Sequence, residues 1–236
     1  MTTCIILAGG LGTRLRSAVP SLPKCLAPIS GKPFIQWQLQ SLANRGINHF
    51  ILALGYESDQ VVTALSDSWA NFFNIKVTKE PDLLGTGGAI KYAMQQYDLK
   101  EAIIANGDTF VGGSLSQMTI PLDFDSGEKM RIATVFKKNR SRFGGISVDN
   151  LRNVTAFLEK GQIDDGLINA GLYRVDYRVF ELGPYYKFSM ETCIMPKLVE
   201  LRALQARELT GPFIDIGVPD DYHYFDKNVL NYVKKT

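Results

Sequence analysis

Short apolar runs alternate with helical patterns in the first half of the chain. Short apolar runs predict buried strands at Thr3–Leu7, 50–54 and 102–105, and a further strand is predicted at 75–78. Apolar residues at helical spacing predict helices over 34–45, 59–69 and 87–96. Gly46 would end the first of these helices, and Ser58 would cap the second. Apolar strands separated by helices predict an α/β fold with a mainly parallel sheet covered on both faces.

The second half contains more strand signals. Strands are predicted over 131–137, 144–148 and 154–159, which together resemble a meander, and over 167–175. Helices are predicted over 190–205 and 219–232, with Pro219 in a first helical turn. No long linker or low-complexity segment interrupts the pattern. We therefore expect a single domain, residues 1–236, around a mixed sheet.

Composition and charge exclude several classes of protein. Hydrophobic residues make up 45% of the chain and charged residues 21%, as in ordinary globular proteins. A net charge of +2 creates no strong field for nucleic acid or an anionic membrane, and no apolar run reaches the roughly 18 residues of a membrane helix. Three widely spaced cysteines, without metal-ligand spacing, favour a reducing cytoplasm. The sequence therefore predicts a cytoplasmic protein with neither nucleic acid nor membrane as partner.

A glycine-rich loop follows the first predicted strand. The chain reads Leu7-Ala8-Gly9-Gly10-Leu11-Gly12-Thr13-Arg14, and Lys24 comes shortly afterwards. Glycines let backbone N–H groups approach an anion without a Cβ in the way, and Arg14 and Lys24 add positive charge. A P-loop is absent, and the third glycine of a dinucleotide-binding fingerprint is replaced by Leu15. The loop therefore suits a triphosphate better than a dinucleotide.

The string Gly-Gly-x-Gly-Thr-Arg-x9-Lys-x3-Pro, from Gly9 to Pro28, resembles the signature of the sugar-nucleotide pyrophosphorylases, a family of nucleotidyltransferases. The resemblance implies a Rossmann-like, GT-A-like fold and transfer of a nucleoside monophosphate from an NTP to a sugar 1-phosphate, with release of pyrophosphate. It also implies that residues 1–112 mainly bind nucleotide and residues 113–236 mainly bind the sugar phosphate. The implied catalytic residues are Arg14, Lys24 and Asp108. The implied nucleotide-binding residues are Leu7, Ala8, Gly9, Gly10, Gly12, Thr13, Arg14, Glu80, Gly85, Thr86, Gly87 and Asn106.

Glu80 carries information about the base. Guanine presents N1–H and an exocyclic amine as adjacent donors, and one carboxylate can accept from both. Uridylyl- and thymidylyltransferase relatives often have glutamine at this place, so Glu80 favours GTP. The alternative is a surface glutamate at the end of a strand.

Two aspartates are implied as ligands of Mg²⁺. Asp108 follows Asn106-Gly107 at the end of a predicted strand, and Asp215 lies in a string that resembles the family motif Asp-Ile-Gly-Thr-Pro, with Val218 in the threonine place. Mg²⁺ often takes only one or two carboxylates together with phosphate oxygens. The resemblance therefore predicts one magnesium ion held from two distant parts of the chain.

The sugar-phosphate site is also implied by resemblance. Phe157-Leu158-Glu159-Lys160 is similar to a Phe-x-Glu-Lys-Pro motif, although Gly161 replaces the proline. The segments around Asn169 and Glu191 are similar to Asn-x-Gly-x-Tyr and Phe-Ser-x-Glu motifs. The implied sugar-phosphate ligands are Glu159, Lys160, Asn169, Gly171 and Glu191. For Glu191, a helix-capping role remains an alternative. The basic segment 137–142 is expected to be a solvated connection, or alternatively to bring a cation over the phosphates.

Strings 15–17, 22–24, 27–29 and 84–90 resemble the branch of the family that activates D-glycero-D-manno-heptose 1-phosphate. The implied reaction is heptose 1-phosphate plus GTP giving GDP-heptose for surface polysaccharide synthesis. The alternatives are a mannose-1-phosphate guanylyltransferase, a glucose-1-phosphate thymidylyl- or uridylyltransferase, and a silent regulatory subunit that binds a nucleotide sugar. Assembly into a homo-oligomer stays open.

Overall fold

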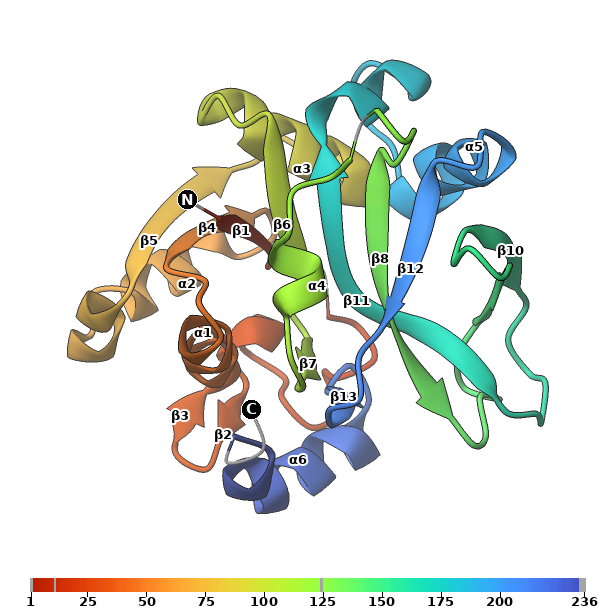
Figure 1. The fold of residues 1–236 in the computed structure, drawn as a ribbon. Coiled ribbons are helices and arrows are strands. Elements are labelled where there is room, and N and C mark those ends of the chain that lie inside the picture. Colours follow the sequence, from red (N-terminus) through yellow and green to blue (C-terminus); the bar gives the residue numbers. More distant parts are fainter. Residues whose placement is uncertain (1, 11, 124, 234–236) are drawn as a thin grey trace. The chain divides into compact units, whose positions relative to one another are not determined.

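The computed structural model describes residues 2–10, 12–123 and 125–233, and the chain forms two compact units (Figure 1). The first unit contains the residues up to Leu83, the segment Ala105–Gly113 and the residues from Gly211 onwards. The second unit contains Leu84–Ile104 and Ser114–Thr210. Each unit therefore combines segments that are far apart in the sequence.

Parallel strands form the centre of the first unit. They are β1 (Thr3–Leu7), β4 (His49–Leu54) and β5 (Asn74–Lys79), and β4 pairs with both of the others in parallel. The end of β6 (Glu101–Asn106) reaches the same unit, where the Gly107 N–H donates to the Leu7 carbonyl at 3.0 Å. The predicted strands of this half are confirmed. Their carboxyl ends share one edge, where ligands of open parallel sheets bind.

The first two predicted helices have different outcomes. Helix α1 (Phe34–Asn44) ends two residues before Gly46, whose φ of +89° is the left-handed conformation that favours glycine after a helix. The second helix is shorter than predicted: α2 (Ser58–Ala64) is followed by turns and by the 3₁₀-helix η2 (Ser68–Phe72). Ser58 is a helical residue and not the cap. Val61 is the one residue that α2 buries. Packing against the core therefore does little to stabilise a longer helix here.

Several short elements of the first unit have no clear sequence signal. They are η1 (Lys24–Leu26) and the antiparallel pairs β2 (Pro28–Ile29) with β3 (Lys32–Pro33) and β7 (Thr109–Val111) with β13 (Phe213–Asp215). The last helix, α6 (Pro219–Val233), begins at Pro219 as predicted and contacts β2 and β13. The pairing of β7 with β13 joins segments about a hundred residues apart.

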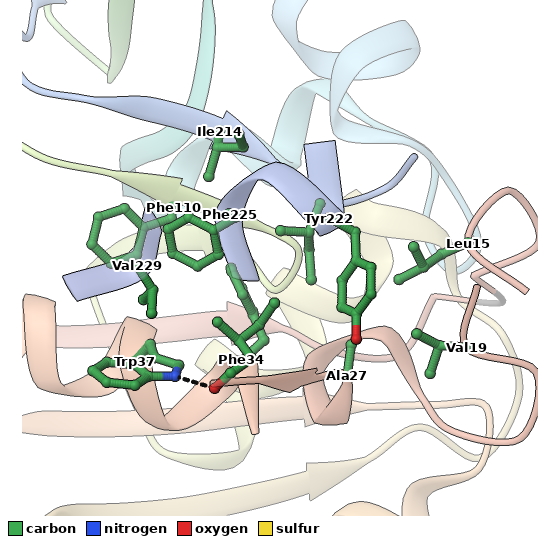
Figure 2. Packing of buried hydrophobic residues seen from close by; sticks show 12 residues of the cluster. Leu15, Val19, Ala27, Phe34, Trp37, Phe110, Ile214, Tyr222, Phe225 and Val229 are labelled. Atoms are coloured by element: carbon green, nitrogen blue, oxygen red, sulfur yellow. Dashed lines mark hydrogen bonds between the residues drawn. The ribbon is translucent and has the colours of Figure 1, made fainter. Parts of the chain in front are cut away.

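An aromatic cluster joins these short elements in the first unit (Figure 2). Phe225 of α6 is fully buried, and its ring centroid lies 5.8 Å from that of Phe34 and 5.1 Å from that of Phe110. Trp37 packs at the edge of the cluster and donates its Nε1–H to the Ile29 carbonyl at 2.8 Å. The cluster therefore connects α1, β7 and α6 within the first unit.

The strands of the second unit do not form the predicted meander. They are β8 (Met130–Lys137), β9 (Gly145–Val148), β10 (Val154–Leu158), β11 (Gly166–Asp176) and β12 (Leu204–Glu208). The long strand β11 pairs antiparallel with both β8 and β9, so β8 and β9 are not neighbours, whereas β9 and β10 are. Strand β12 adds in parallel to β8. A meander prediction uses sequence order alone, and here β11 inserts between consecutive strands.

The predicted helix over 190–205 is also wrong in its second part. The segment contains the π-helix η4 (Met190–Ile194) and α5 (Met195–Glu200), then a turn with Arg202 at φ +53°, and then β12. The residues 204–206 alternate between buried and half-buried, as in a strand against a neighbour. The other helical elements of this unit are α3 (Gly85–Gln96), α4 (Ser116–Thr119) and the 3₁₀-helix η3 (Tyr177–Leu182).

Across residues 2–10, 12–123 and 125–233, every helix is too short or too polar to cross a bilayer.

The aromatic cluster predicts a large effect of Phe225→Ala on stability. The substitution removes a fully buried ring and leaves a cavity, which costs about 3–5 kcal/mol of unfolding free energy. Leu230→Ala on the same helix is the matched control, because 59% of that side chain is exposed and surface changes stay within about 0.5 kcal/mol. Urea denaturation of both variants measures the difference. Equal losses would contradict the assigned core.

Candidate active site

The glycine-rich loop lies against the ends of two neighbouring strands. A methyl group at Gly9 would lie only 2.6 Å from the backbone nitrogen of Gly55 and 3.0 Å from Glu80 Oε1. The Tyr56 N–H donates to the Gly9 carbonyl at 3.2 Å, and the Glu80 N–H donates to the Leu54 carbonyl at 2.8 Å. The Glu80 carboxylate therefore lies beside the loop that was predicted to hold the nucleotide.

Lys24 is positioned by the same loop. It begins η1, and its aliphatic stem packs on Gly12, where a methyl group would lie 3.0 Å from Lys24 Cγ. Gly12 has a φ of +66°, which a residue with a Cβ rarely adopts. The Lys24 ammonium forms an ion pair with Asp108, with Nζ 2.9 Å from Oδ2. Gly12 thus has a structural reason to be glycine, in addition to its predicted contact with the nucleotide.

Asp108 lies in a turn fixed by backbone contacts. On one side of it, the Gly107 N–H donates to the Leu7 carbonyl at 3.0 Å, and a methyl group at Gly107 would lie 2.4 Å from that same oxygen. The carbonyl of Asp108 accepts from the Ile216 N–H at 2.9 Å. The next residue, Thr109, is paired with Asp215 in the β7–β13 ladder. The ladder therefore brings the two predicted metal ligands to one end of the unit.

Four charged groups meet around Gly217. A methyl group at this position would lie 2.7 Å from Asp215 Oδ1 and 3.3 Å from both Arg14 Nη2 and Lys24 Nζ. Since Lys24 Nζ also contacts Asp108, the first unit brings together all three predicted catalytic residues and both predicted metal ligands. The close approach of these side chains requires a residue without a Cβ at position 217.

The electrostatics of this group suit a cation that binds phosphate. The pKa of Asp215 is raised above its ordinary value, first by burial and then by repulsion from the Asp108 carboxylate. The Gly217 N–H, Lys24 and Arg14 act in the opposite direction. Two carboxylates with adjacent cations fit a Mg²⁺ ion that takes its remaining ligands from water and phosphate. Among the described residues, no cluster of three or more Asp, Glu, His or Cys side chains offers a complete protein-only metal site.

In the second unit, the glycines at the start of α3 allow a close helix–segment contact. The N–H groups of Gly87 and Gly88 donate to the Phe188 carbonyl at 3.0 and 3.2 Å. A methyl group at Gly85 would lie 2.6 Å from that carbonyl oxygen, and one at Gly87 would overlap the Phe188 ring at 2.3 Å. Packing against Phe188 thus explains these glycines without a ligand, and the nucleotide-binding roles of Gly85, Thr86 and Gly87 remain a prediction.

Glu191 is held by hydroxyl groups of this same segment. Its Oε2 accepts from Thr86 Oγ1 at 2.6 Å and from Ser189 Oγ at 2.7 Å. Thr86 Oγ1 also accepts from the Met190 N–H at 2.9 Å. The N-cap of η4 is Ser189, which accepts from the Thr192 N–H. Glu191 therefore stabilises the contact between α3 and η4 rather than capping a backbone N–H, and its sugar contact stays a prediction.

Asn169 and Gly171 form an irregular part of β11. The pairing of β11 with β8 shifts between Asn169 and Tyr173, and Gly171 in between has a φ of +67°. The Asn169 side chain accepts from the Gly171 N–H at 2.8 Å and donates to the Tyr173 hydroxyl at 2.6 Å. This β-bulge fixes the direction of the Asn169 amide.

Glu159 and Lys160 are exposed and follow directly after β10. Arg140 is buried next to this segment, with only 3% of it exposed. It forms an ion pair with Asp164 at 2.6 Å and donates to the Glu159 carbonyl at 3.3 Å. The expectation that 137–142 is a solvated connection is therefore wrong for Arg140. A methyl group at Gly145 would lie 2.6 Å from its guanidinium, so glycine makes room for it.

Sequence reasoning missed three residues that shape the site. Gly55 allows the approach of Gly9, Gly217 allows the approach of four charged groups, and Arg140 supports the segment of Glu159. The sequence contained a signal for two of them, because Gly217 lies in a motif already named and Gly55 follows a predicted strand. It contained no signal for the burial of Arg140, which depends on a distant partner, Asp164.

The raised pKa of Asp215 predicts that neutralising this side chain stabilises the folded protein. In the folded protein this carboxyl group keeps its proton to a higher pH than in the unfolded chain, so it lowers stability as the pH rises from about 3.8 through the raised pKa. Asp215→Asn removes this penalty and keeps an acceptor for the Gly217 N–H. We expect a higher unfolding free energy than wild type at pH 7, without metal or nucleotide, and no difference near pH 3.

Asp165→Asn, at an exposed site, is the control and should change stability at neither pH. Chemical denaturation at both pH values measures the effect. A destabilised Asp215→Asn variant at pH 7 would show that attraction to Lys24 and Arg14 exceeds the cost of burial and of repulsion by Asp108.

The chain is similar to known proteins over nearly its whole length. A D-glycero-alpha-D-manno-heptose 1-phosphate guanylyltransferase from Campylobacter jejuni is 36% identical over 94% of this chain and 97% of that protein. The protein of the same description from Aneurinibacillus thermoaerophilus is also 36% identical, over 97% of this chain and 99% of its own. The crystal structure of HddC from Yersinia pseudotuberculosis, which was also solved in complex with GMP-PN, matches with a TM-score of 0.84. It is 33% identical and covers 97% of this chain and 100% of that chain.

These matches confirm the predicted fold class, a mixed and mainly parallel sheet flanked by helices. The model of the family described as "Nucleotidyl transferase" matches residues 3–231. Nearly the whole described chain is therefore covered by one family model, and the chain belongs to the nucleotidyltransferase family.

Proposed function

We propose that the protein transfers GMP from GTP to D-glycero-D-manno-heptose 1-phosphate, giving GDP-heptose and pyrophosphate. The observation that carries this proposal is the meeting of Arg14, Lys24, Asp108 and Asp215 around Gly217. The similarity to two proteins described as heptose 1-phosphate guanylyltransferases supports the choice of sugar and base. Three free cysteines, two of them buried, favour a reducing compartment, and we therefore assign the protein to the cytoplasm.

The position of Glu80 supports guanine as the base. Its Oε1 lies close to Gly9 and Gly55 at the strand ends, on the loop assigned to the nucleotide. A carboxylate there accepts from the N1–H and the exocyclic amine of guanine, whereas uracil and thymine would place a carbonyl against it. The glycine-rich loop, from Leu7 to Arg14, supplies backbone N–H groups for the phosphates.

Charge neutralisation is the main catalytic task. An oxygen of the sugar phosphate attacks the α-phosphorus of GTP in line with the departing pyrophosphate, and both reactants are anionic. Arg14 binds the β- and γ-phosphate oxygens through its planar fork, and Lys24 lies at the α-phosphate, where charge develops. No general base is needed because a phosphate oxygen is already ionised at neutral pH. Asp108 and Asp215 would hold Mg²⁺, which neutralises phosphate oxygens when bound.

The second unit supplies the residues assigned to the sugar phosphate. Exposed Lys160 is suited to the phosphate, and exposed Glu159 to the sugar hydroxyls. Asn169 in the bulge of β11 is fixed by Gly171 and Tyr173, so its amide is preorganised for a hydroxyl group. Glu191, already bonded to Thr86 and Ser189, acts on the sugar through its remaining acceptor capacity.

A substrate panel tests the proposal. GTP, UTP, dTTP and CTP are each combined with heptose 1-phosphate, mannose 1-phosphate and glucose 1-phosphate, with Mg²⁺, and pyrophosphate release is measured. We expect the highest kcat/KM for GTP with the heptose. Preference for mannose 1-phosphate would change the assigned sugar and leave the assigned base and reaction unchanged. Preference for a pyrimidine nucleotide would contradict the role of Glu80. No turnover with any pair would favour a silent regulatory subunit.

Lys24→Ala should nearly abolish turnover with intact folding. Loss of one preorganised charge in such a site costs on the order of 10²–10³ in kcat. Lys227→Ala, an exposed lysine on α6, is the matched control and should retain wild-type kcat. Steady-state kinetics and thermal unfolding are measured together. A kcat of Lys24→Ala within tenfold of wild type would count against the assigned role.

A further inference from the structure

A buried glutamine supports the turn that carries Asp108. Gln38 lies in α1, and only 4% of it is exposed. Its Nε2 donates to two backbone carbonyls, that of Asn106 at 2.7 Å and that of Thr109 at 2.8 Å. These carbonyls come immediately before and after the dipeptide Gly107-Asp108. One side-chain amide therefore holds both ends of the turn that presents the carboxylate.

The chemistry of the contact requires an amide donor. The NH₂ group has two hydrogens, and the two carbonyls use both. Gln38 Oε1 is buried and has no hydrogen-bond partner among the described residues, so within this part of the chain the amide is engaged through its donor side alone. A buried acceptor without a partner costs free energy. This buried acceptor of Gln38 lowers stability. The presence of glutamine here therefore indicates that its two N–H donors are required at this position.

Other contacts of the turn hold single points of it. Gly107 is bonded to β1 through Leu7, and the Asp108 carbonyl is bonded to Ile216, which follows β13. The β7–β13 ladder holds the Thr109 end, whereas Gln38 bonds to both ends at once. Asp108 also contacts Lys24 through Oδ2, so a change in the turn would move the carboxylate relative to the cation.

We propose that Gln38 is a positioning residue that sets the Asp108 carboxylate for metal binding by holding the backbone on both sides of it. This inference rests on the proposed function, because it assigns Asp108 to a divalent cation. Gln38 touches neither substrate nor metal; it acts through the backbone of Asn106 and Thr109. Supporting partners of metal ligands commonly change metal affinity by about 10–100-fold when they are removed.

The test compares Gln38→Met with Gln40→Met. Methionine has a similar length and no donor, and Gln40 lies exposed on the same helix, bonded to Asn44. Hydrogen exchange of the segment 104–111 is measured in the protein without ligands. Mn²⁺ binding is measured by electron paramagnetic resonance with GTP and without sugar phosphate, so that no turnover occurs.

For Gln38→Met we expect faster exchange in this segment and a Mn²⁺ dissociation constant raised about tenfold, with the KM for the sugar 1-phosphate unchanged. Gln40→Met should match wild type in all three. Unchanged Mn²⁺ affinity in Gln38→Met would overturn the proposal, even if its melting temperature falls, because a merely structural role moves stability alone.

If Gln38→Met fails to fold, Gln38→Glu decides. A protonated glutamate has the same shape and one donor for two carbonyls, so it should weaken Mn²⁺ binding by a smaller factor. Mn²⁺ affinity equal to wild type in this variant would also overturn the proposal. Neither binding nor exchange requires the heptose, so a failed substrate panel would remove the proposed reaction without affecting this result.

Discussion

Burial of neighbouring charged groups, above all Asp215 beside Asp108, is the constraint on which the candidate site of the first unit depends. Burial and the neighbouring Asp108 both raise the pKa of Asp215, and two cations with one backbone N–H oppose that effect. Such a group is costly to assemble in the absence of a ligand, because each charge loses part of its hydration. In the proposed function, the same group is the one that would bind a polyphosphate and a divalent ion. Burial of apolar side chains in the surrounding core offsets this free-energy cost. In that core, Phe225 packs against aromatic rings from distant parts of the chain.

Glycines determine how closely these groups approach. Gly9 and Gly55 let two strand ends meet beside Glu80, and Gly217 lets cations and carboxylates surround one backbone position. In the second unit, Gly87 admits the Phe188 ring, and Gly145 admits the guanidinium of Arg140. Each contact is shorter than a Cβ would permit. Protein packing thus explains most of these glycines, and ligand contact at Gly9 and Gly87 stays a separate prediction.

Polar side chains assigned to the sugar phosphate are already bonded within the second unit. Asn169 is oriented by the bulge of β11, and Glu191 accepts from two hydroxyl groups. Arg140 holds the backbone of Glu159 from the buried side. A network of this kind restricts rotamers before any ligand binds, which reduces the entropy lost on binding.

The sequence by itself determined the elements with strong local signals and the residue types of the site. The local patterns of β1, β4, β5 and β6 were sufficient to predict these strands. The motifs around Lys24 were sufficient to name residues that the first unit brings together. Only the tertiary structure decided the order of the strands in the second unit, where β11 inserts between β8 and β9, and the strand β12 inside a helical pattern. Burial of Arg140 and the support of Asp108 by Gln38 were decided in the same way. The reason is physical: these features depend on contacts between residues that lie 21 to 74 positions apart, and no local preference encodes such a partner.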